Sequence, residues 1–124
     1  MIDYILILLG ALLTVFWGIA HLFPTMSVVK GFGEISLDNK RIILMEWIVE
    51  GVTLIFIGTL VAGVTLIDSQ SIVSRFVYYL SIITLILLAL ISLFTGFRIN
   101  FLPFKLCPVI FTVSSILILL GTML

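Results

Sequence analysis

Four long runs of apolar residues follow one another along the chain, separated by shorter segments that contain polar residues or proline. Each run reaches the length of about 20 residues that an α-helix needs to cross the hydrocarbon core of a bilayer. Backbone N–H and C=O groups in lipid must be hydrogen bonded within their own segment, so we expect these runs to be helices. The pattern predicts helices over about residues 4–23, 42–67, 72–97 and 106–124.

The second and third connections between these helices are short. A polar turn over residues 68–71 separates the second helix from the third, and residues 98–105, with Pro103, separate the third from the fourth. Short connections make successive helices antiparallel. The sequence therefore predicts an all-α, polytopic integral membrane protein, in which residues 1–124 form one up-and-down four-transmembrane-helix bundle.

The first connection, residues 24–41, is longer than a link between two helices requires. Apolar residues such as Val29 and Phe32 are interleaved with charged residues such as Lys30 and Glu34. We predict an interfacial loop that lies at the membrane surface or folds back over the mouth of the bundle. It would act either as a passive linker or as a lid over a site.

Composition supports a membrane location. The 124 residues are 63% hydrophobic and 10% charged, whereas soluble domains are about 45–50% apolar and about 25% charged. A chain of this length has too little interior to hide so much apolar surface from water. The net charge of zero gives no indication of a nucleic-acid partner. The sole cysteine, Cys107, excludes an intramolecular disulfide and is interpreted as a packing residue.

In length and in the order of its apolar runs, the chain resembles the DoxX-like group of small four-helix membrane proteins. The resemblance covers the whole chain and rests on size and topology. It implies the four-helix fold and assigns no functional residue.

Basic residues predict the orientation in the membrane. The first and third connections lie on one side of a four-helix bundle, and that side carries five of the six basic residues: Lys30, Lys40, Arg41, Arg98 and Lys105. The other side carries only Arg75. By the positive-inside rule, the first and third connections are expected to be cytoplasmic, with both termini outside a plasma (inner) membrane.

Two carboxylates lie inside the second apolar run. Glu46 and Glu50 are one helical turn apart and share a face. A charged side chain at the centre of a membrane helix costs about 2.5–3.5 kcal/mol, and less near a helix end. We therefore expect both side chains to face the bundle interior, where desolvation and mutual repulsion disfavour the doubly charged state.

Other polar and aromatic residues are brought to the same end of the bundle by this topology. Together with Glu46 and Glu50, His21 is predicted to exchange protons, either in catalysis or in coupled binding. The residues predicted to bind a ligand are Trp17, Asn39, Trp47, Arg98 and Asn100. The alternative is structural: Arg98 or Lys105 neutralises a glutamate, and the tryptophans anchor helices at the interface.

No metal site is predicted, because one histidine and two glutamates at this spacing match no metal-binding motif. The sequence does not indicate a cofactor. Small residues form rows at helical spacing, Gly10, Thr14 and Gly18 in the first helix and Gly58 and Ala62 in the second. Such rows let helices approach closely within a bundle or in a homodimer.

Three functions remain open at the level of sequence. The first is binding or transport of a small, partly lipophilic molecule with proton coupling. The second is a membrane-embedded acid/base enzyme of isomerase or hydrolase type, acting on a lipid or isoprenoid-like substrate. The third is an accessory subunit of a larger membrane complex, in which the polar cluster is structural.

The predicted orientation can be tested by labelling single cysteines in intact cells. In a Cys107→Ser background, Ser69→Cys is expected to react with a membrane-impermeant maleimide, because the second connection faces outward. Ser36→Cys, in the first connection, is expected to react only after permeabilisation. The reverse pattern would invert the predicted orientation.

Overall fold

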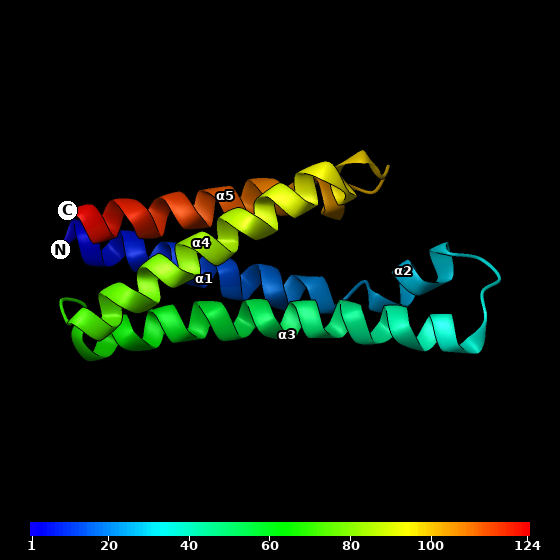
Figure 1. Cartoon of the computed structure of the whole chain (residues 1–124), viewed down its shortest axis with the longest axis horizontal. Coiled ribbons are helices and arrows are strands. Elements are labelled where there is room, and N and C mark those ends of the chain that lie inside the picture. Colours follow the sequence, from blue (N-terminus) through cyan, green and yellow to red (C-terminus); the bar gives the residue numbers. More distant parts are fainter.

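The computed structural model describes all residues 1–124, and almost all of them are helical (Figure 1). The elements in chain order are α1 (Ile2–Leu22), α2 (Thr25–Gly31), α3 (Leu37–Asp68), α4 (Ile72–Phe94), the 3-10 helix η1 (Gly96–Arg98) and α5 (Leu102–Met123). The chain has four spans that are long and apolar enough to cross a membrane. They are α1, α3, α4 together with η1, and α5. The predicted all-α fold with four membrane spans is confirmed.

Two helices begin earlier than the apolar pattern predicts. The Ser36 side chain accepts a hydrogen bond of 3.2 Å from the Asn39 backbone N–H, which caps α3 and starts it at Leu37 rather than near residue 42. Pro103 does not break the chain between helices but lies in the first turn of α5. Proline is tolerated there because the first N–H groups of a helix have no intrahelical partner.

The segment over residues 24–41 is more regular than the interfacial loop that we predicted. It contains the short helix α2, which packs against α3, and then the first turns of α3. None of its residues lines the main cavity described below. The 32 residues of α3 are about 48 Å long at about 1.5 Å per residue. This exceeds a hydrocarbon core of about 30 Å, and α3 projects beyond the end of α1 in Figure 1.

Helix α1 lies at the centre of the arrangement. It packs along both α3 and α5, and α5 in turn packs along α4. Helices α3 and α4 are joined by a short turn but contact each other much less, because they diverge away from that turn (Figure 1). The two termini lie at the same end as this turn. The wide end of the divergence is therefore the end that carries the first and third connections.

The α1–α3 contact depends on small residues at which the two backbones meet. A Cβ added to Gly58 would lie 2.5 Å from the Ala11 carbonyl oxygen, and one added to Gly18 would lie 2.8 Å from the Gly51 carbonyl oxygen. Neither position has room for a side chain. Close backbone approach of this kind increases the dispersion contacts that hold helices together in lipid.

The α1–α5 contact is built in the same way on a different face of α1. A Cβ at Gly10 would lie 2.8 Å from the Ser114 carbonyl oxygen, and one at Gly121 would lie 2.5 Å from the Asp3 carbonyl oxygen. The predicted row of Gly10, Thr14 and Gly18 is thus divided between two neighbours, with Gly10 toward α5 and Gly18 toward α3. Both glycines serve packing within one chain.

The outward surface of the bundle is apolar. Only 28 of the 124 residues are buried, and the exposed residues include most of the large hydrophobic side chains. Examples on α4 are Phe76, Ile83 and Leu87, each more than half exposed. An apolar surface of this extent is matched by contact with lipid.

Gly58 and Gly63 form a matched pair for testing the helix contact. Gly58→Ala is expected to lower stability by about 1–3 kcal/mol, because the new methyl group meets the α1 backbone. Gly63→Ala on the same helix meets no atom within 4 Å and should be neutral or stabilising by up to about 1 kcal/mol. Titration with sodium dodecyl sulfate, followed by circular dichroism, measures both. Equal effects would contradict the proposed role of the contact.

Candidate functional site

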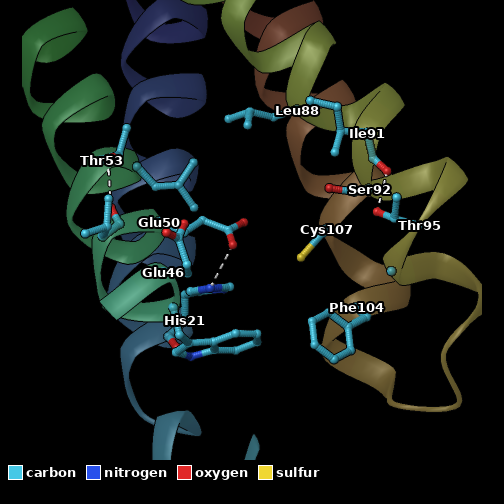
Figure 2. A pocket seen from close by; sticks show the side chains of 14 residues that line it. His21, Glu46, Glu50, Thr53, Leu88, Ile91, Ser92, Thr95, Phe104 and Cys107 are labelled. Atoms are coloured by element: carbon cyan, nitrogen blue, oxygen red, sulfur yellow. Dashed lines mark hydrogen bonds and ion pairs between the residues drawn. The ribbon is translucent and has the colours of Figure 1, made fainter. Parts of the chain in front are cut away.

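A cavity of about 450 Å³ lies where α3 and α4 diverge. It is bounded by α3 on one side and by α4, η1 and α5 on the other, with the last turn of α1 contributing to the wall (Figure 2). Its size falls in the range of about 300–1,000 Å³ that is typical of small-molecule sites. Its polar lining residues are His21, Glu46, Glu50, Thr53, Ser92 and Thr95, with Cys107 beside them.

His21 and Glu50 form the central polar pair of this cavity. The His21 side chain is only 3% exposed, and its Nε2 lies 3.3 Å from Oε2 of Glu50, whose side chain is 38% exposed. The contact lacks hydrogen-bond geometry, so Nε2 is buried without a hydrogen-bond partner. In Figure 2 the Glu50 carboxylate points into the space between α3 and the α4–α5 wall.

Trp47 holds the His21 ring in place. The two rings are stacked, with centroids 4.0 Å apart and an interplanar angle of 16°. The indole Nε1 of Trp47 donates a hydrogen bond of 2.6 Å to the His21 carbonyl oxygen. The ring of Phe104 in α5 lies nearly perpendicular to that of Trp47, with the ring centroids 5.3 Å apart. The histidine is therefore positioned by Trp47 of α3, whose ring is in turn contacted by Phe104 of α5.

The end of α1 is also secured by side chains. The last carbonyl groups of a helix have no intrahelical partner and need another donor when they are removed from water. Trp47 supplies one donor, and Thr25 supplies another through a hydrogen bond of 2.6 Å from its Oγ1 to the Leu22 carbonyl oxygen. These two bonds fix the turn of α1 that carries His21.

The predicted site residues divide into two groups. Four of them line the cavity: His21, Glu46, Trp47 and Glu50. Of the two carboxylates, Glu46 is exposed and Glu50 is partly exposed. The other four predicted residues do not line it: Trp17, Asn39, Arg98 and Asn100.

Those four residues lie elsewhere for different reasons. Trp17 packs against the core, where its indole Nε1 is buried without a hydrogen-bond partner. Asn39 belongs to the first turn of α3, and Arg98 and Asn100 lie at the end of η1 and just after it, all three exposed. The ion pair that Arg98 or Lys105 could form with a glutamate is not present, and the pair that forms is His21–Glu50.

The wall opposite α3 is lined by residues that were not predicted as site residues, among them Ser92 of α4, Thr95 just after it, and Phe104 and Cys107 of α5. Ser92 and Thr95 are three residues apart at the end of α4, so they share a helix face. This spacing of two hydroxyl side chains was the one feature of the sequence that could have indicated these lining residues. Thr95 Oγ1 donates to the Ile91 carbonyl oxygen at 2.6 Å, so its hydroxyl is already satisfied. No group of three His, Cys, Asp or Glu side chains is arranged to hold a metal ion.

The fold defines a small helical integral membrane protein with four membrane spans. No known family model matches the chain, and neither a curated protein nor a solved structure matches it. The resemblance to the DoxX-like group therefore stays a prediction.

Substitution of each tryptophan by phenylalanine distinguishes the contribution of the Trp47 hydrogen bond to stability from the contribution of the ring size. Trp47→Phe and Trp17→Phe remove the same atoms, but only Trp47 donates a hydrogen bond, since Nε1 of Trp17 has no acceptor. Trp47→Phe is therefore expected to cost about 1–3 kcal/mol more stability than Trp17→Phe. Detergent unfolding of the two variants measures the difference, and equal losses would show that the bond to His21 contributes nothing.

Proposed function

We propose that the protein binds a small, partly lipophilic molecule in the cavity between α3 and α4, with its polar end against His21 and Glu50. The observation that carries this proposal is the buried Nε2 of His21, which faces the cavity without a hydrogen-bond partner. A buried polar group left unpaired costs about 1–3 kcal/mol. A ligand that pairs with Nε2 would recover that cost.

The apolar part of the cavity suits the remainder of such a molecule. Leu54 of α3 and Leu88 and Ile91 of α4 contribute apolar walls between the polar pair and the narrow end of the divergence. Sites for small molecules commonly combine mostly apolar walls with a few convergent polar groups. An amphiphilic molecule satisfies both parts of the cavity at once.

The His21–Glu50 pair also supports proton exchange coupled to binding. Histidine is the side chain whose ordinary titration range lies closest to neutral pH, and a carboxylate at 3.3 Å is a proton partner within reach. The same pair would serve acid/base catalysis. Binding is favoured over catalysis because the cavity is lined by no lysine, arginine or asparagine side chain that could orient a substrate oxygen or stabilise a developing negative charge.

The predicted orientation in the membrane indicates the side from which a ligand would bind. The cavity lies toward the end that carries five of the six basic residues, and the positive-inside rule assigns that end to the cytoplasm. A ligand would therefore bind near the cytoplasmic leaflet.

Native mass spectrometry of protein extracted in mild detergent tests the proposal. The wild type is expected to retain a small molecule in addition to bulk lipid. Glu50→Gln should reduce that occupancy about tenfold or more, because a hydrogen bond to a charged group contributes about 1.5–3 kcal/mol. The matched control is Asp68→Asn, which removes a carboxylate at the opposite end of the bundle. Identical bound species in all three proteins would contradict the assignment of the cavity.

A further inference from the structure

Resting on the proposed binding function, we infer that the ligand is a lipophilic organic cation. The charges around the cavity give the first reason. Its lining contains two carboxylates, Glu46 and Glu50, and one histidine, but no lysine or arginine. Glu46 is exposed and the Glu50 side chain is 38% exposed, so the desolvation expected from the sequence is not what the structure shows. With both carboxylates ionised, the net formal charge of the lining is −2 with His21 neutral and −1 with His21 protonated.

The basic residues at this end of the bundle leave that charge uncompensated. Arg41 lies 3.8 Å from Asp38 in an exposed pair on the first turns of α3. Arg98 and Lys105 belong to the segments that border the cavity, yet neither lines it or pairs with a glutamate. An anionic ligand would need such a group turned inward, since a buried charge requires an opposite partner.

His21 is compatible with the same charge in one of its two neutral tautomers. Its side chain is 97% buried, and Nε2 faces the cavity without a hydrogen-bond partner. In a neutral imidazole with the proton on Nδ1, Nε2 offers only a lone pair. It would accept an N–H from an organic ammonium group or stabilise a neighbouring positive charge. A cation can therefore be bound by Glu50 and His21 together.

The aromatic residues of the cavity favour the same charge. Trp47 and Phe104 lie at the end where the carboxylates are found, with their ring centroids 5.3 Å apart. Aromatic ring faces attract cations through the quadrupole of the ring, most strongly where water is excluded. Aromatic rings are used in this way to recognise organic cations such as quaternary ammonium groups.

The organic nature of the ligand follows from what surrounds the charge. A zinc ion needs three or more protein ligands in one geometry, and no group of three such side chains is arranged in that way. Seven of the 14 lining residues are hydrophobic. The positive group is therefore expected to carry apolar substituents that occupy the space beside Leu54 and Leu88.

Three probes of similar shape test the sign of the charge: tetraphenylphosphonium, tetraphenylborate and neutral triphenylphosphine oxide. Binding to the purified wild type in a neutral detergent is measured by equilibrium dialysis against protein-free micelles. The cation is expected to bind saturably and at least about tenfold more tightly than the other two.

A double variant, Glu46→Gln with Glu50→Gln, should weaken binding of the cation about tenfold or more. The matched control, Glu34→Gln with Asp38→Asn, removes two negative charges from the same end without altering the cavity, and it should bind as the wild type does. The comparison of the three probes uses only wild-type protein, so it remains decisive even if the double variant does not fold.

The outcomes separate the two proposals. Tighter binding of the neutral probe or the anion would overturn the inference of a cation and leave the binding function standing. Absence of saturable binding by all three probes would also overturn it, and the species retained in native mass spectrometry would then decide the proposed function separately. Cation binding of equal strength in the wild type and in the variant with both Glu46→Gln and Glu50→Gln would place its site outside this cavity and overturn the inference as well.

Discussion

The architecture depends on the close approach of the α1 backbone to two neighbours. Lipid tails are as apolar as the side chains, so moving an apolar side chain from lipid into a helix contact yields little hydrophobic free energy. Helices in a membrane therefore associate through dispersion contacts and hydrogen bonds between them. Gly58 against Ala11 brings α3 onto one face of α1, and Gly10 against Ser114 brings α5 onto another. A helix with small residues on two faces can accept two partners, and this makes α1 the central element of the bundle.

The cavity is a consequence of that arrangement. Because α3 and α5 are both held by α1, and α4 is held by α5, α3 and α4 have little contact beyond the turn that joins them. Their divergence leaves space at one end, and the end of α1 places His21 beside it. The space therefore results from how the helices pack at their glycine contacts. The polar residues lie beside it but are not its cause.

Trp47 links stability to the chemistry of the site. Its indole N–H satisfies the His21 carbonyl oxygen, while its ring face stacks on the imidazole of the same residue. The result is a histidine whose backbone and ring are both fixed but whose Nε2 has no hydrogen-bond partner, although the Glu50 carboxylate lies 3.3 Å away. A rigid, desolvated and unsatisfied group is costly to a folded protein, and this cost is the reason for assigning the cavity to ligand binding.

The sequence by itself determined the number and approximate limits of the membrane spans, because lipid requires about 20 apolar residues in each hydrogen-bonded helix. It also identified His21, Glu46, Glu50 and Trp47 as unusual residues for such a chain. It placed the starts of two helices too late, since Ser36 caps α3 and Pro103 is accommodated in the first turn of α5.

Tertiary structure alone decided which of these residues meet. Glu50 lies against His21 rather than against Arg98 or Lys105, and Trp17 packs against the core rather than lining the cavity. These outcomes depend on how each helix is rotated about its own axis. That rotation is set by backbone contacts between glycines and residues far away in the chain, and the apolar pattern of a single helix does not contain it.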